Sequence, residues 1–99
     1  MSEHKVIIAG WSTVEPQKRE AVIESFKDLV LRARSAPGCL DFAITADPVD
    51  PGRVNIFELW QSAKDWKAWR AVCKPLKRIA KTIQMEVQKH IVQKSEPPL

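Results

Sequence analysis

A chain of 99 residues with 44% hydrophobic and 28% charged residues has the composition of a single globular domain, residues 1–99. It contains no apolar run near the roughly 20 residues of a membrane span, so we expect no membrane partner. The net charge is +4, and basic residues cluster between positions 64 and 81 around an apolar stripe. This pattern favours a solvated helix face, or attraction of an acidic ligand, over nucleic-acid binding.

Neither metal binding nor secretion is indicated by the sequence. The two cysteines, Cys39 and Cys73, and the two histidines, His4 and His90, lack the clustered spacing of a metal site. The first residues do not have the charged-then-apolar pattern of a signal peptide. We therefore predict a cytoplasmic protein with no metal site and no disulfide.

The first half of the chain predicts a strand, a helix and a second strand. Residues 5–12 are rich in β-branched side chains and apolar on both faces. Pro16 suits the first turn of a helix, and apolar residues at intervals of three and four extend this helix to about Ser35. Residues 39–46 then alternate between apolar and polar side chains, as in a strand.

The third strand is predicted over residues 53–61, after turn residues at 47–52, and should pair with the second strand in an antiparallel hairpin. Alternate side chains of a strand point to opposite faces. One face carries Val54, Ile56, Glu58 and Trp60, and the other carries Asn55, Phe57 and Leu59.

A second helix follows, with Ser62 as its N-cap and Asp65 at its third position. Pro75 interrupts the apolar stripe of this helix. Because an internal proline removes a hydrogen bond and clashes with the preceding turn, we predict two helical pieces, 63–73 and 75–83.

The last strand is predicted over residues 85–92, and residues 93–99 form an expected flexible tail. The order β-α-β-β-α-β predicts an α+β domain with the ferredoxin-like fold, a core over about 5–92, and both helices on one face of a four-stranded antiparallel sheet. The other face, with Asn55, Phe57 and Leu59, would be exposed. We therefore predict a symmetric homodimer packed sheet to sheet.

Aromatic residues are concentrated in one part of the chain, which has four Trp, three Phe and no Tyr. Trp60, Trp66 and Trp69 follow closely after Glu58, and Trp11 ends the first strand. Large rings in these positions predict either a bulky core or an aromatic-walled pocket. Trp60, for example, would either contact a flat ligand or pack on Phe26 and Leu76.

The order and spacing of several short segments resemble the antibiotic biosynthesis monooxygenase (ABM) family of small dimeric α/β-barrel proteins. The resemblance spans about residues 5–92. Its segments are Ile8-Ala9-Gly10-Trp11 followed by Pro16, Pro37-Gly38-Cys39-Leu40, Asp47-Pro48 through Asp50-Pro51-Gly52, and Glu58-Leu59-Trp60. In this family a cavity lies between sheet and helices. Some members oxidise aromatic phenols or quinols with O₂ without metal or flavin, and others degrade haem.

The resemblance implies that Glu58 and Trp60 project into this cavity, that Trp11 closes it, and that Trp66 and Trp69 form its helical wall. Many members carry a His on the second helix. Here that stretch reads Trp66-Lys67-Ala68-Trp69-Arg70, so haem degradation through such a His is not supported.

Glu58 is the candidate base, because burial among aromatic rings raises the pKa of a carboxyl group toward neutral pH. The alternative is that it pairs with a cation such as Arg70, which is itself a candidate for binding an anionic group. We expect a cofactor-independent monooxygenase acting on a small aromatic or quinol-like ligand. The alternatives are a non-catalytic ligand-binding or sensing domain of the same fold and a haem-degrading enzyme.

Overall fold

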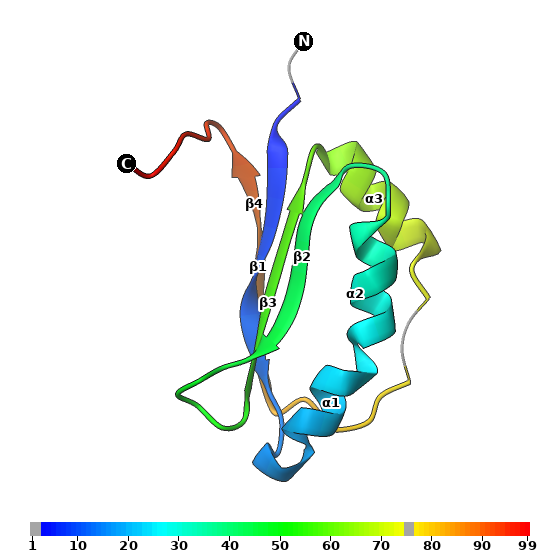
Figure 1. Ribbon diagram of the computed structural model, residues 1–99, viewed down its shortest axis with the longest axis vertical. Helices are drawn as coiled ribbons and strands as arrows, with labels where there is room; N and C mark the ends of the chain where they lie inside the picture. The colour runs from blue at the N-terminus through cyan, green and yellow to red at the C-terminus, as the bar shows by residue number, and fades with distance from the viewer. Residues whose placement is uncertain (1–2, 75–76) are drawn as a thin grey trace.

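The ferredoxin-like fold predicted from the sequence is confirmed by a computed structural model, which describes residues 3–74 and 77–99 (Figure 1). The elements, in chain order, are β1 (Lys5–Thr13), the short 3-10 helix η1 (Pro16–Lys18), α1 (Arg19–Ser25), α2 (Lys27–Arg34), β2 (Cys39–Ala46), β3 (Arg53–Trp60), α3 (Ala63–Val72) and β4 (Gln84–Val92). Among the described residues, no helix is long and apolar enough to cross a membrane.

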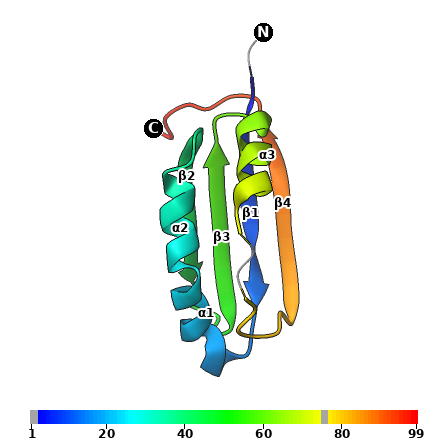
Figure 2. The same cartoon turned by 90° about the vertical axis from the view of Figure 1, so that its right-hand side faces the viewer.

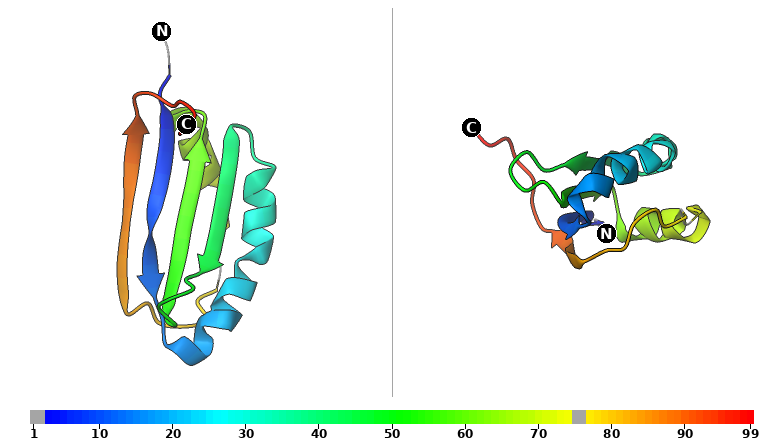
Figure 3. Two further views of the ribbon diagram at one scale, coloured as in Figure 1. Left: turned by 60° about the vertical axis from the view of Figure 1, so that its left-hand side comes forward. Right: turned by 90° about the horizontal axis from the view of Figure 1, so that it is seen from below.

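The four strands form one antiparallel sheet in the order β2-β3-β1-β4. β2 and β3 make the predicted hairpin, and the register pairs Ile8 with Glu58 and Trp11 with Asn55. The helices lie on one side of this sheet (Figure 3), with α1 and α2 over β2 and β3 and with α3 over β1 (Figure 2). The pleat therefore divides the side chains into a helix-covered face and an open face.

The predicted first helix is interrupted at Phe26, which separates α1 from α2 with φ −86° and ψ −7°. The Phe26 amide donates to the Ile23 carbonyl at 3.1 Å, a tightened turn, before regular bonding resumes from Val30 to Phe26 at 2.9 Å. The axis changes direction here (Figure 1). The interruption places the Phe26 ring between the helices and the sheet, where it packs against buried valines.

The second helix is capped as predicted. Ser62 Oγ accepts the Asp65 amide at 3.1 Å and donates to Asp65 Oδ2 at 2.9 Å. Gly38, which has φ +81°, lies against the same cap, and a Cβ on it would collide with the Asp65 carboxyl group. The turn between α2 and β2 is thus packed directly on the start of α3.

The prediction of a second helical piece over 75–83 is wrong for residues 77–83, the part of it that the structure describes. Residues 77–83 contain no helix, and positions 75 and 76 lie outside the described residues. α3 ends at Val72, and Cys73 is extended at φ −67° and ψ 125°. The Ile83 amide instead donates to the Thr13 carbonyl at 2.8 Å. A segment this short forms a helix only when packing supports it. Here the Ile83 hydrogen bond joins the segment to the end of β1 instead.

Two groups of buried residues fill the layer between sheet and helices. The ring cluster contains the large side chains and consists of Val6, Ile8, Ala33, Phe42, Trp60 and Trp69. The valine cluster lies toward α1 and consists of Val14, Val22 and Val54. Ile44 packs against both clusters. The two differ in side-chain volume, and the space between them contains the candidate site.

Candidate active site

A cavity of about 190 Å³ lies between the sheet and the helices, at the boundary of the ring cluster and the valine cluster. Its walls are mainly apolar, with a carboxylate, a guanidinium, a hydroxyl and a thiol among them. The strands contribute Ser12, Phe42, Ile44, Val54, Ile56 and Glu58. The helical side contributes Phe26, Leu29, Trp69, Arg70 and Cys73. A few polar groups converging in an apolar hollow are typical of small-molecule sites.

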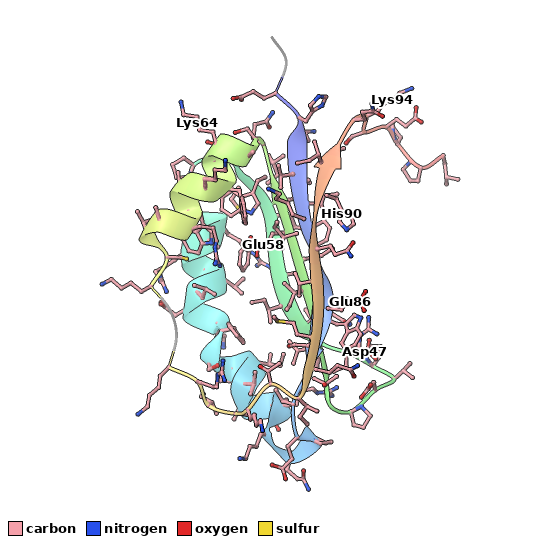
Figure 4. All side chains as sticks on the ribbon, turned by 180° about the vertical axis from the view of Figure 1, so that it is seen from behind. Asp47, Glu58, Lys64, Glu86, His90 and Lys94 are labelled. Atoms are coloured by element: carbon pink, nitrogen blue, oxygen red, sulfur yellow. The ribbon has the colours of Figure 1, made fainter. Side chains whose placement is uncertain are left out.

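Glu58 reaches this cavity because it shares the helix-covered face of β3 with Ile56 and Trp60, each two residues away. Figure 4 shows it on the helix side of the sheet. Its Oε1 atom accepts a hydrogen bond of 2.9 Å from Trp60 Nε1. Burial raises the pKa of Glu58 above its usual value, although the Trp60 hydrogen bond and the Arg70 charge oppose the shift. Glu58 is therefore a carboxyl group that Trp60 holds in position and whose pKa is raised by burial.

Arg70 lines the cavity from α3, and its positive charge acts on Glu58. Among the described residues, the salt bridges do not include a pair between Glu58 and Arg70. The simple ion pair considered from the sequence is therefore not formed. A cation and a carboxylate face the same cavity without neutralising each other by direct contact, so both are available to a ligand.

Of the four tryptophans, only Trp69 lines the cavity. Trp60 is fully buried in the ring cluster, where its ring stacks on Trp69 with centroids 6.1 Å apart. It does not pack on Phe26 as considered from the sequence, because Phe26 belongs with the valine cluster. Phe42 meets the Trp69 ring edge-on at 6.2 Å. Trp60 therefore holds Glu58 by a hydrogen bond and supports Trp69, and it is not among the described residues that line the cavity.

Trp66 and Trp11 do not reach the cavity. Trp66 packs at the margin of the ring cluster, with Lys89 Nζ 5.0 Å from its ring centroid. Trp11 is on the open face of the sheet, opposite Asn55, with the Arg53 guanidinium 5.2 Å from its ring. The pleat explains this placement, because Trp11 alternates with Gly10 and Ser12, which face the helices.

Three further residues of the cavity carry chemistry or shape that the sequence reasoning did not assign to a site. Ser12 lies on the same face of β1 as Val6 and Ile8, so the two-residue period of the strand was a usable signal. Cys73 and Phe26 were placed on apolar helix stripes, and both line the cavity. No spacing rule indicated that these stripes would face a hollow, since that depends on how the helices pack.

The described residues do not contain a group of three His, Cys, Asp or Glu side chains close enough to hold a metal ion. His90 pairs with Ile7 in the sheet and points away from the helices (Figure 4), and His4 precedes β1. Cys39 and Cys73 are free thiols. Burial is the main cause that raises the pKa of Cys39, with the charges of Glu58 and Asp41 adding to it.

Comparison with known proteins places this fold in a family. The model of the family described as antibiotic biosynthesis monooxygenase matches residues 6–72. The chain belongs to the ABM family. The matched region extends from β1 to the end of α3 and includes Glu58, Trp69 and Arg70.

Similar solved structures have the same fold over most of the chain. A candidate ABM protein from Chloroflexus aurantiacus is 25% identical, with a TM-score of 0.68 over 94% of this chain and 97% of its own. A conserved protein of unknown function from Bacteroides thetaiotaomicron is 19% identical, with a TM-score of 0.69 over 91% of this chain and 99% of its own. A haem-degrading protein from Mycobacterium tuberculosis, solved with two haems in its active site, is 14% identical, with a TM-score of 0.67 over 93% of this chain and 99% of its own.

A curated relative, an uncharacterized protein from Synechocystis, is 26% identical over 61 residues. The match covers 62% of this chain and 42% of that relative, so the chain spans less than half the length of the curated protein it matches. These comparisons establish the ABM family and its fold. The chemistry has to be argued from the cavity.

Proposed function

We propose that this protein is a cytoplasmic monooxygenase that oxidises a small aromatic or quinol-like molecule with O₂ and needs neither metal nor flavin. The supporting observation is the environment of Glu58: a carboxyl group with a raised pKa in an apolar cavity, held by Trp60 and facing Arg70. Membership of the ABM family supports the reaction class.

The chemistry requires a substrate with an acidic C–H or O–H group. Glu58 takes this proton and leaves an electron-rich anion beside the Arg70 guanidinium. The anion gives one electron to O₂, and the substrate radical and superoxide combine to form a C–O bond. The resulting peroxide takes the proton back and loses water, which leaves a new carbonyl group. One oxygen atom enters the product and the other enters water, so all the electrons come from the substrate.

The apolar walls contribute by excluding water from these intermediates. Trp69 and Phe42 present aromatic surface on which a flat substrate would pack. The cavity of about 190 Å³ is smaller than the roughly 300–1,000 Å³ of typical ligand sites. It therefore favours a substrate with one or two rings over a polycyclic one. It also disfavours haem, and no histidine is among the described residues that line it.

We also infer a homodimer that packs through the open face of the sheet. Phe57 is 36% exposed there and lies beside Leu59 and Trp11, an apolar area that favours coverage. Asn55 already donates to Asp47 Oδ1 at 2.9 Å and accepts from Arg53 Nε at 2.7 Å. Phe57 and Leu59 would therefore carry the interface. Sedimentation of the wild type and of Phe57→Asp tests this inference, and a monomeric wild type at micromolar concentration would contradict it.

The activity is tested by oxygen uptake with a panel of hydroquinones, naphthohydroquinones and anthrone, corrected for uncatalysed oxidation. Glu58→Gln should lower turnover about 100-fold or more, because general bases contribute roughly 10²–10⁴-fold. Ligand affinity, measured without O₂, should change little. Glu24→Gln is the matched control, since Glu24 is exposed and, among the described residues, forms a salt bridge with Lys27 alone. Equal rates for Glu58→Gln and wild type would remove Glu58 from the mechanism.

The second candidate is a non-catalytic ligand-binding or sensing domain. No histidine is among the described residues that line the cavity, which leaves Glu58 as the main proton-transfer group there. A cavity with so few such groups favours ligand binding without catalysis. Thermal stabilisation by aromatic ligands, together with no oxygen uptake for any of them, would support this candidate over the monooxygenase.

A further inference from the structure

A second hollow of about 240 Å³ lies beside the first. It is formed where β1 ends, against α1 and residues 77–82. Ser12 and Phe26 line both hollows, so the two are neighbours separated by these side chains. A molecule with its ring in the first hollow would extend a substituent past Ser12 and Phe26 into the second.

The second hollow has basic and hydroxyl side chains and, among its described lining residues, no acid. Lys77 and Arg78 supply the positive charge, and Ser12 and Thr82 supply hydroxyl groups. The Ser25 hydroxyl also lines it but donates to the Val22 carbonyl at 2.6 Å. Among the described residues, the salt bridges involve neither Lys77 nor Arg78. Two cations without a protein counter-ion therefore face this space.

The segment carrying these cations is attached to the sheet rather than projecting as a solvated helix. The Ile83 amide donates to the Thr13 carbonyl at 2.8 Å, and Ala80 packs against the valine cluster. Figure 1 shows the segment running from α3 past α1 to β4. Lys77 and Arg78 are thus brought to the hollow by the packing of Ala80 and by the backbone bond at Ile83.

We propose that the second hollow binds a carboxylate carried on a short tether by the aromatic ligand whose ring occupies the first hollow. This inference rests on the proposed function for the position of the ring. A carboxylate suits Arg78, whose guanidinium can donate two parallel hydrogen bonds, while Lys77 adds a point charge. The first hollow has one cation, Arg70, together with the Glu58 carboxyl group, whereas the second has two cations and, among its described lining residues, no acid, so the tethered carboxylate is favoured in the second.

The test compares two ligands that differ only in charge, 3-(1-naphthyl)propanoate and 3-(1-naphthyl)propan-1-ol. Isothermal titration calorimetry measures their binding to the full chain, and neither needs to be oxidised. The acid should bind at least tenfold more tightly than the alcohol. In the double variant Lys77→Gln/Arg78→Gln, this preference should disappear while the affinity for the alcohol is retained.

Lys64→Gln/Lys67→Gln is the matched control, because it removes the same charge from exposed positions on α3. The control should keep the preference for the acid. Equal binding of the two ligands to the wild type, binding of neither, or a preference that survives Lys77→Gln/Arg78→Gln would overturn the proposal. Loss of the preference in both double variants would also overturn it, since the effect would then be long-range charge attraction.

Oxygen uptake separates this inference from the proposed function. If a hydroquinone bearing the propanoate tether binds with the expected preference but consumes no O₂, the carboxylate site stands and the monooxygenase fails. If oxygen is consumed equally fast with and without the carboxylate, at equal KM, the monooxygenase stands and the carboxylate site fails.

Discussion

The ring cluster and the valine cluster occupy the same layer between sheet and helices, but only one of them is filled. In the ring cluster, Trp60 and Trp69 stack and Phe42 closes against them. In the valine cluster, Val14, Val22 and Val54 meet between sheet and helix with smaller side chains. Both hollows border these valines. Large rings fill the space between helix and sheet, whereas small side chains leave it open.

This comparison changes how the tryptophan-rich part of the sequence is interpreted. The concentration of indoles between Trp60 and Trp69 predicted either a pocket wall or a core, and most of it is core. The site lies at the edge of that core, where Trp69 and Glu58 meet the valine side. The filled half fixes the position of the catalytic candidate, and we expect the hollow half to admit the ligand.

Trp60→Ala gives the largest expected effect, because Trp60 is 0% exposed and at the centre of the filled half. Truncating a buried Trp typically costs about 3–5 kcal/mol. Val54→Ala in the hollow half should cost about 1–2 kcal/mol, since it removes two methyl groups beside existing space. Urea denaturation of both variants measures the difference. Val49→Ala, at a position 88% exposed, is the control and should have no effect. Equal costs for Trp60→Ala and Val54→Ala would mean that both halves are equally packed.

Ile56→Phe should fill the first hollow, because Ile56 lines it from β3. Ligand affinity should fall tenfold or more, about 1.4 kcal/mol, while the free energy of unfolding changes by less than about 1.5 kcal/mol. Calorimetric titration and urea denaturation measure the two quantities. Val72→Phe adds the same ring at a position 69% exposed on α3 and should leave binding unchanged. Unaltered affinity in Ile56→Phe would mean that ligands bind elsewhere.

Ser62→Ala should affect the ring cluster and the cavity together, because Ser62 caps the helix that carries Trp69 into the ring cluster and Arg70 to the cavity wall. Loss of the cap should cost about 1 kcal/mol. Thermal unfolding measures this cost, and ligand affinity should fall with it as α3 loosens. Ser35→Ala is the control, since its hydroxyl makes only a long contact of 3.5 Å to the Leu31 carbonyl. No change in Ser62→Ala would show that packing alone holds α3.

The smallest expected effect is a pH dependence at Glu58, on the boundary of the two halves. Its raised pKa means that the folded protein holds this proton more tightly than the unfolded chain. The corresponding stability is present below the unfolded pKa and is lost as the pH rises through the folded pKa. Glu58→Gln should therefore stabilise the protein more at pH 7 than at pH 4, relative to wild type. Denaturation of both proteins at the two pH values measures this difference.

Asp47 provides a contrast of opposite sign. Hydrogen bonds from Asp50, Asn55 and Val49 lower its pKa to about 2, so its contribution is present above pH 3.8 and is lost as the pH falls through the folded pKa of about 2. Because Asp47 is unchanged in Glu58→Gln, its effect cancels in the comparison. A Glu58→Gln difference that grew toward pH 4 would contradict the raised pKa of Glu58.

The sequence by itself determined the four strands, the two-face pattern of β3, the Ser62 cap and hence the ferredoxin-like order, because these follow from periodicity and local hydrogen bonding. Only the tertiary structure decided that residues 77–83 contain no helix and join the end of β1 through Ile83, that Trp11 faces away from Glu58, and that Trp60 is buried as a support. The physical reason is volume. Local pattern assigns a side chain to a face, but a hollow exists only where opposing side chains are too small to meet, and that depends on both layers at once.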